Sequence, residues 1–168
     1  MEIRAYHLGE EHQIWQLFYQ TVHGINAQDY SQNQLDAWAP NSFDQHLWQK
    51  KLTTLGTFVC VNSRRIQGDN DDKKANNVIL GYSDLQKDGY IDHFFCHQQH
   101  QGLGVGTALM TYIHNLAQKR GITQLSADVS ITAKGFFEKH DFNIVKSQNV
   151  LIRGQILENF KMVKPLSF

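Results

Sequence analysis

The sequence is poor in the features that would assign it to a specialised class of protein. Its 168 residues include two prolines and two cysteines, and 16 basic residues balance 16 acidic ones. A neutral chain lacks the basic face with which a dedicated duplex-binding protein displaces counterions, and it lacks a polybasic membrane anchor. No apolar run approaches the roughly 18 residues of a membrane span, and the N-terminus shows no signal peptide. We therefore expect a cytoplasmic protein that binds neither nucleic acid nor membranes.

The cysteines and histidines do not form a recognisable metal motif. Cys60 and Cys96 each lie in a strand-like run, which favours two buried free thiols in a reducing compartment. His97 and His100 are close in sequence, but no third ligand follows at a spacing typical of zinc sites, so we predict no metal. The length predicts one globular domain over residues 1–168, long enough to bury its own core.

Hydrophobic patterning predicts an α/β protein. Ser31 with Gln34 and Ser42 with Gln45 have the spacing of capping boxes that open two helices after a first amphipathic one, and Gly121 ends a later, longer helix. The expected order is a strand, three helices, three strands, a helix, a strand, a short helix and two final strands. The expected strands cover residues 3–7, 57–61, 78–85, 90–96, 125–129, 142–152 and 155–163, with a polar hairpin excursion at 64–77.

A glycine-rich turn between an expected strand and an expected helix is the most informative motif. Gly102, Gly104 and Gly106 alternate there. N–H groups at a helix start have no intrahelical partner, and glycine lets an anion approach the main chain, so the turn predicts a phosphate site. A Walker A ending is absent, and Thr107 and Leu109 stand where a dinucleotide fingerprint needs glycine. Both nucleotide motifs therefore fail on spacing.

The same turn carries a resemblance to a known family. Gln101-x-x-Gly104-x-Gly106 resembles the (Gln/Arg)-x-x-Gly-x-(Gly/Ala) pattern of the GNAT acyltransferase superfamily. The family's strand, pyrophosphate loop and helix are similar to YIDHFFCHQQHQGLGVGTALM, and its second signature helix is similar to ITAKGFFEKHDF. A bacterial subgroup of small N-acetyltransferases is similar to DYSQNQLDAWAP and RGQILENFKMVKPL. The resemblance covers most of the chain and is weakest at residues 64–77.

The resemblance implies a fold and a donor substrate. The fold is a single domain with a mixed central sheet, splayed between its fourth and fifth strands (here 90–96 and 125–129), and with helices on both faces. Acetyl-CoA would lie in the gap, with its pantetheine arm bonded to main chain around Phe95 and Cys96. The residues implied to contact it are Phe95, Cys96, Gln101, Gly102, Leu103, Gly104, Val105, Gly106, Thr107 and Ser130.

The implied reaction is direct acetyl transfer to a primary amine of a small molecule or peptide. Strand alternation places Asp92 and His93 on opposite faces, and either could take the proton of the incoming ammonium. The N-terminal helices would supply the acceptor pocket, where His23, Tyr30 and Trp38 could hold a cationic or aromatic amine.

One residue departs from the family pattern. Many members carry tyrosine, placed to protonate the CoA thiolate, where this chain has Phe137. Water would then protonate the thiolate, or another donor such as Ser130, Thr132 or His140 would. The departure leaves an alternative function open, a non-catalytic acyl-CoA-binding sensor, and the charged segment 64–77 suggests another, a protein-interaction module. Family members often pair through their C-terminal strands, so the resemblance also implies a homodimer.

Overall fold

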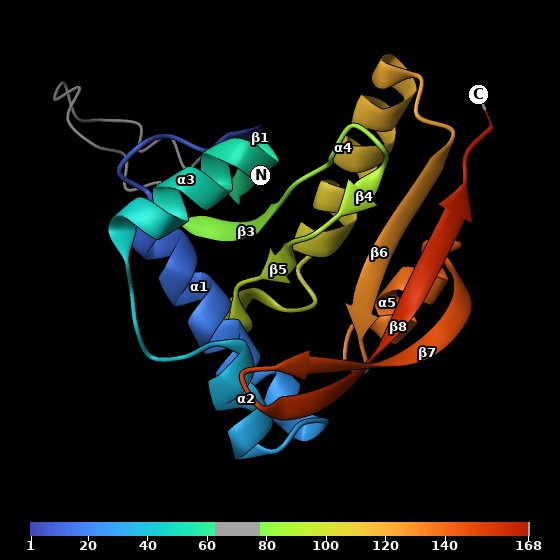
Figure 1. Cartoon of the computed structure of the whole chain (residues 1–168). Coiled ribbons are helices and arrows are strands. Elements are labelled where there is room, and N and C mark those ends of the chain that lie inside the picture. Colours follow the sequence, from blue (N-terminus) through green and yellow to red (C-terminus); the bar gives the residue numbers. More distant parts are fainter. Residues whose placement is uncertain (63–77, 168) are drawn as a thin grey trace, which may run out of the picture.

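In the computed structural model, which describes residues 1–62 and 78–167, the strands form two four-stranded sheets. The first has the order β1-β2-β3-β5 and the second the order β4-β6-β8-β7 (Figure 1). The predicted hairpin excursion at 64–77 lies outside the described residues. The strands are β1 Glu2–Ala5, β2 Phe58–Val61, β3 Ile79–Ser83, β4 Tyr90–Ile91, β5 Phe94–Cys96, β6 Gln124–Ser130, β7 Asn143–Ile152 and β8 Gln155–Pro165.

Helices α1 (Glu11–Gly24) and α4 (Val105–Arg120) cover opposite faces of the first sheet. Along β2, Phe58 and Cys60 pack into the core with α4, whereas Val59 packs into the core with α1. A strand buried on both faces has no polar face, which explains the uninterrupted apolar run of β2. α4 ends as predicted at Gly121, whose φ of 66° is left-handed.

The remaining helices begin at identifiable caps. The predicted capping box of Ser31 and Gln34 is confirmed at the start of α2 (Gln32–Trp38). The one predicted at Ser42 is wrong, because the Asp44 carboxylate accepts the N–H of Leu47 and so caps α3. The other helical segments are α3 Gln45–Leu55, α5 Lys134–Lys139, η1 Asn26–Gln28 and η2 Gln98–His100. Among the described residues, no helix is both long and apolar enough to cross a bilayer.

The strand predicted at 90–96 is broken, and the two sheets part at the break. Its first part, β4, runs parallel to β6, while its second part, β5, runs antiparallel to β3. At the break, the N–H groups of Asp92 and His93 donate to the buried carboxylate of Asp84, at 3.3 and 2.7 Å. A side chain thus provides the acceptors that a neighbouring strand would otherwise supply. The predicted splay between sheet halves is confirmed, and it lies inside the expected strand.

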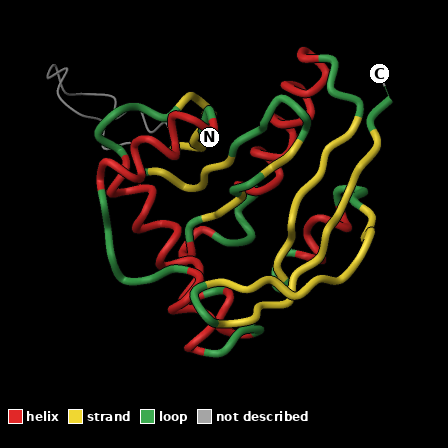
Figure 2. Tube along the Cα trace, viewed as in Figure 1, coloured by secondary structure: helices red, strands yellow, loops and turns green. Residues whose placement is uncertain are grey.

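The long β7–β8 hairpin closes one end of the splay. Its turn lies at Arg153 and Gly154 as predicted, both with positive φ. Figures 1 and 2 show the far end of the hairpin reaching across to α2. There the Tyr30 hydroxyl donates to the Glu158 carbonyl at 2.6 Å, and Arg153 Nη1 donates to the Ala37 carbonyl at 2.7 Å. The N-terminal helices and the C-terminal hairpin therefore enclose a common space.

Candidate active site

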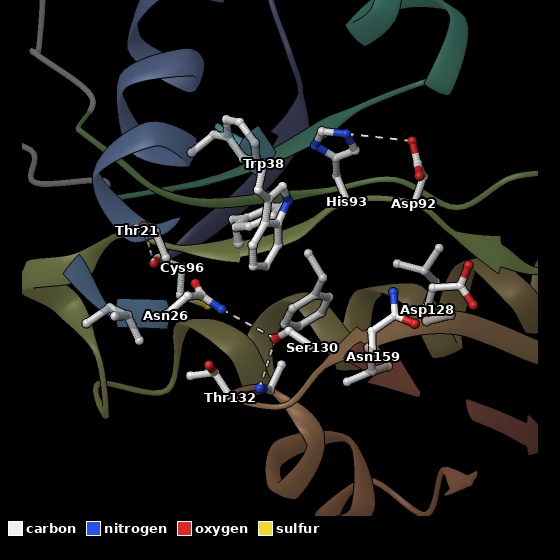
Figure 3. Close-up of a pocket in the computed structure, with 18 of the residues that line it drawn as sticks. Thr21, Asn26, Trp38, Asp92, His93, Cys96, Asp128, Ser130, Thr132 and Asn159 are labelled. Carbon is white, nitrogen blue, oxygen red and sulfur yellow. Dashed lines mark hydrogen bonds and ion pairs between the residues drawn. The ribbon is translucent and has the colours of Figure 1, made fainter. Parts of the chain in front are cut away.

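A cavity of about 1250 Å³ opens where the two sheets part. Helices α1 to α3 and the break before β5 form one side, and β6 with the segment after it lies opposite (Figure 3). Most of the residues predicted for the site line this cavity: Tyr30, Trp38, Asp92, His93, Phe95, Cys96, Gln101, Gly102, Gly104, Val105, Gly106, Thr107 and Ser130. The fold thus gathers segments that lie far apart in the sequence.

Two predicted site residues, His23 and Leu103, do not line the cavity. His23 Nε2 lies 2.8 Å from the Ala39 carbonyl, so the ring fastens α1 to the segment after α2. Leu103 is 61% exposed on the outside of the glycine-rich turn. The side chain of His23 therefore does not face the predicted acceptor pocket, whereas the contact implied for Leu103 is one of main chain and does not depend on its side chain.

The three glycines of the turn leave its main chain uncovered. Gly102 and Gly104 have φ of 73° and 82°, which disfavour a side chain, and a Cβ on Gly106 would lie 3.0 Å from the Phe136 ring. When residues with left-handed φ alternate before a helix, their N–H groups form a concave surface that attracts anions. The first N–H groups of α4 add to this surface because they have no partner within the helix. Gln101 braces the turn, since its side chain donates to the Cys96 carbonyl at 2.8 Å.

The free edge of β5 faces the cavity, because β5 ends the first sheet. The N–H of His97 donates to the Leu80 carbonyl at 2.8 Å, and the register pairs Phe95 with Tyr82. Since main-chain groups alternate in direction along a strand, those of Phe95 point to β3 and those of Phe94 and Cys96 to the free edge. The register thus directs the main chain of Phe95 away from the free edge, where the family resemblance implied a contact, and leaves Phe94 and Cys96 facing that edge.

Cys96 contributes main chain rather than its thiol. Its carbonyl already accepts the Thr21 hydroxyl at 3.0 Å, as well as the Gln101 amide. Burial raises the pKa of the Cys96 thiol to about 12, with a smaller effect from Cys60, so the sulfur stays protonated. A protonated thiol is a poor nucleophile, which agrees with a reaction that needs none.

Asp92 and His93 lie on the same side of the chain, not on opposite faces as strand alternation predicted (Figure 3). The break between β4 and β5 removes the regular pleat, and the His93 Nε2 comes within 3.6 Å of Asp92 Oδ2. The His93 ring is buried, with Nδ1 2.8 Å from the Tyr82 hydroxyl. The Asp92 side chain is 37% exposed.

The electrostatics separate the two residues. Burial lowers the pKa of His93 to about 3, and the charge of Lys51 acts in the same direction. His93 is therefore neutral at physiological pH and a weak proton acceptor. Asp92 is the partly exposed carboxylate beside it and lines the cavity. Asp84 accepts hydrogen bonds from the main chain of both residues. Burial raises the pKa of the Asp84 carboxyl to about 6, although these two hydrogen bonds oppose the shift.

Residues on the opposite side differ in their availability to a ligand. Ser130 Oγ accepts the N–H of Ala133 at 3.1 Å and the Asn26 amide at 3.4 Å, so its own proton is left for a ligand. The Thr132 hydroxyl instead donates to Asp29 at 2.7 Å. Phe137 is buried against Phe94 and Phe142, as expected of a packing residue.

Sequence reasoning missed Tyr82, Asp84 and Asp128. Tyr82 positions His93, and Asp84 supports the break. Asp128 lines the cavity and accepts the Tyr90 hydroxyl at 3.3 Å and the Gln148 amide at 2.8 Å. A signal was present for Asp84, because a carboxylate directly after an apolar strand run needs a buried partner. Within residues 1–62 and 78–167, no three His, Cys, Asp or Glu side chains are grouped to hold a metal ion.

Comparison with known proteins agrees with this geometry. A family model described as an acetyltransferase (GNAT) domain matches residues 26–162. The chain therefore belongs to the GNAT acetyltransferase family, a class of enzymes.

The individual relatives point the same way. The chain is 30% identical to the uncharacterized N-acetyltransferase YafP of Escherichia coli over 162 residues, which cover 96% of this chain and 94% of that protein. A crystal structure of a GCN5-related N-acetyltransferase from Rhodopseudomonas palustris superposes with a TM-score of 0.86 and 27% identity, covering 98% of this chain and 95% of that one. A phosphinothricin acetyltransferase from Sinorhizobium meliloti, solved in complex with acetyl-CoA, has a TM-score of 0.69 and 12% identity, covering 98% and 88%.

Proposed function

We propose that the protein transfers the acetyl group of acetyl-CoA directly to a primary amine of a small molecule or peptide. The observation that carries this proposal is the free edge of β5, which faces the cavity and leads into the N-terminus of α4. A fold neighbour solved with acetyl-CoA supports the choice of donor. The homodimer that the family resemblance implies is a separate expectation.

The donor half of the site fits acetyl-CoA in two places. The pantetheine arm carries amide groups and can add to the edge of β5 as a further strand does, using the main chain of Phe94 and Cys96. The pyrophosphate can accept hydrogen bonds from the N–H groups of Val105, Gly106 and Thr107 at the start of α4. The helix dipole there contributes ~0.3–1 kcal/mol per charge at an exposed site. Both contacts use main chain, so they depend on the glycine-rich turn more than on side-chain chemistry.

The acetyl group passes directly from the CoA sulfur to the amine nitrogen, without a covalent enzyme intermediate. The neutral amine nitrogen attacks the thioester carbon, a C–N bond forms, the C–S bond breaks, and CoA leaves as a thiolate. We assign stabilisation of the oxyanion to the Phe94 N–H, because the register of β5 points it to the free edge. Holding both reactants together supplies an effective molarity of about 10⁵ M or more.

Two protons have to move. We assign the amine proton to Asp92, which passes it to solvent through its exposed side; the neutral His93 ring lies beside this carboxylate, with Nε2 3.6 Å from Oδ2. We assign protonation of the thiolate to Ser130, whose hydroxyl proton is uncommitted and is regained from water. His140 does not line the cavity, and Thr132 donates its proton to Asp29.

Two isosteric variants of Gly104 test the donor site. Asn and Asp tolerate a positive φ better than other residues, so both Gly104→Asn and Gly104→Asp should fold. A ligand at a hundredfold excess over Kd stabilises by about 2.7 kcal/mol. We expect acetyl-CoA to raise the Tm of the wild type and of Gly104→Asn, and to have at most a small effect on Gly104→Asp, which places a negative charge beside the pyrophosphate.

Thiol release with an amine panel then tests turnover. A Tm shift in Gly104→Asp equal to that of the wild type would locate the ligand elsewhere. Tight binding of acetyl-CoA without thiol release in the presence of any amine would favour the sensor over the enzyme.

A further inference from the structure

We propose that the acceptor is a primary amine with an aromatic body and without a carboxylate next to the amine, such as an arylalkylamine. This inference rests on the proposed function, because it names the substrate class of the same site. It follows from the surfaces that remain once the donor contacts along β5 and the glycine-rich turn are assigned.

The acceptor side of the cavity is a connected set of aromatic rings, which we call the aromatic wall: Phe18, Trp38, Trp48 and Phe95. Phe18 links its members, with ring centroids 5.6 Å from Trp48 and 5.0 Å from Phe95. The Trp38 ring lies 6.3 Å from Phe95 and projects into the cavity (Figure 3). Aromatic rings at such separations leave faces and edges that favour another ring.

The aromatic wall ends at the reacting groups. The His93 ring lies 6.0 Å from Phe18 and 6.4 Å from Trp48, and its Nε2 lies 3.6 Å from the Asp92 carboxylate. A ligand whose ring packs on the wall can therefore present its nitrogen near Asp92. Because the His93 ring lies between these wall rings and Asp92, we take a short alkyl chain as the link between the ligand's ring and its amine.

Charge selects against amino acids. Asp92 is a partly exposed carboxylate, and neutral His93 does not offset its charge. A carboxylate on the carbon that bears the amine would lie beside Asp92 and be repelled. Asp44, Asp128 and Glu158 also line the cavity and add to its negative charge. Of the two cations that line it in the described part of the chain, Arg153 donates to the Ala37 carbonyl, whereas Lys51 lies over the Trp48 ring, 5.9 Å from its centroid, and could reverse this preference.

Three amines that differ in one group each test the inference. In the presence of acetyl-CoA, we expect kcat/KM for 2-phenylethylamine to exceed that for propylamine, which lacks the ring, by at least tenfold. We expect the same margin over L-phenylalanine, which adds the carboxylate. Equal values for 2-phenylethylamine and propylamine, or a preference for L-phenylalanine, would overturn the inference while leaving the proposed function in place.

A pair of variants locates the ring. Trp38→Leu should raise KM for 2-phenylethylamine at least tenfold and lower kcat/KM for 2-phenylethylamine by a larger factor than kcat/KM for propylamine. Tyr19→Leu is the matched control, because Tyr19 stacks on Trp15 but does not line the cavity. An unchanged KM in Trp38→Leu would overturn the assignment of the wall.

Binding of 2-phenylethylamine, followed through tryptophan fluorescence, tests the pocket independently of turnover. Saturable binding of 2-phenylethylamine that Trp38→Leu weakens supports the inference, whether or not acetyl-CoA binds. Failure of acetyl-CoA to bind would overturn the proposed function and leave this inference standing. Absence of saturable binding at millimolar amine overturns the inference.

Discussion

The residue that distinguishes this site most sharply is His93, because it is a buried histidine held beside a carboxylate. Tyr82 and Asp92 flank its two ring nitrogens, and burial favours the neutral ring. A buried neutral imidazole takes up a proton poorly. His93 is therefore the weaker candidate for the base, and we propose Asp92 for that role.

Asp92→Asn separates these roles. We expect kcat/KM for an amine to fall at least tenfold, because a positioned base contributes about 10²–10⁴-fold, while the Kd of acetyl-CoA stays nearly unchanged. Asp36→Asn is the control, since that carboxylate lies outside the cavity. An unchanged kcat/KM in Asp92→Asn would assign deprotonation to solvent.

His93 should also leave a signature in stability. Its pKa is about 3 in the folded protein and 6.5 ordinarily, so below pH 6.5 the unfolded chain binds a proton that the folded chain does not. Stability from this group is thus present above pH 6.5 and is lost as pH falls. The free energy of unfolding of the wild type, relative to His93→Phe, should fall by up to about 1.4 kcal/mol per pH unit between pH 6.5 and 5.

Urea titrations of both proteins at several pH values measure this difference. Asp84 has a raised pKa of about 6 and contributes with the opposite sign, losing stability as pH rises. It is present in both proteins, so its contribution cancels in the difference. A constant difference across the pH range would show that His93 titrates normally.

At the scale of elements, the break between β4 and β5 decides the geometry of the cleft. The sequence predicts nearly every helix and strand, because periodicity and caps such as Ser31 and Gly121 are local signals. It does not predict the break, since YIDHFFC has no proline or glycine and reads as one strand. The break depends on Asp84, which belongs to another segment, and a tertiary hydrogen bond leaves no periodic pattern.

The same reasoning separates the predictable part of the site from the rest. The glycine-rich turn was predictable, because φ and main-chain exposure follow from glycine itself. The side-chain directions of His23, Asp92 and His93 were not, because they depend on the break and on packing between helices. Local chemistry therefore predicts the donor half, while the acceptor half needs the assembled fold.

A graded series at Asp84 tests the break. Asp84→Ala leaves the buried N–H groups of Asp92 and His93 without an acceptor, and each such group costs ~1–3 kcal/mol. Asp84→Asn keeps one acceptor oxygen and should lose less. We expect the free energy of unfolding to fall in the order wild type, Asp84→Asn, Asp84→Ala, with faster amide hydrogen exchange at Asp92 and His93. Equal stability of the three proteins would contradict this account.

At the scale of the whole molecule, several polar contacts join the N-terminal helical region to the C-terminal sheet across the cavity. Tyr30 provides two of them, donating to the Glu158 carbonyl at 2.6 Å and accepting the Ile131 N–H at 2.9 Å. The phenol ring also lies 5.6 Å from Trp38. Tyr30 therefore acts mainly as a fastening between the two sides of the cavity, which differs from the substrate contact predicted for it.

Tyr30→Phe keeps the ring and removes the hydroxyl. We expect a loss of ~1–3 kcal/mol in the free energy of unfolding, because the Ile131 N–H and the Glu158 carbonyl lose a partner. We also expect a higher KM for the amine, because Trp38 of the aromatic wall packs beside the Tyr30 ring and would be held less firmly. Thermal unfolding and steady-state kinetics measure both, with Tyr19→Phe as the control. An effect on stability alone would show that the wall keeps its place without this fastening.

The helical part of the aromatic wall and the donor contacts come from different parts of the sequence, and this has a consequence for how the enzyme can evolve. The main-chain donor contacts proposed here lie in one continuous stretch, residues 94–107, whereas the helical part of the wall comes from residues 18–48. The two stretches meet at the Phe95 ring, against which Phe18 and Trp38 lie, and at the Cys96 carbonyl, which accepts the Thr21 hydroxyl, so helical mutations that keep these contacts leave the donor stretch in place. A chimera that takes its first 50 or so residues from a relative should keep acetyl-CoA and adopt the relative's amine, so a change of acceptor is open to a single recombination event.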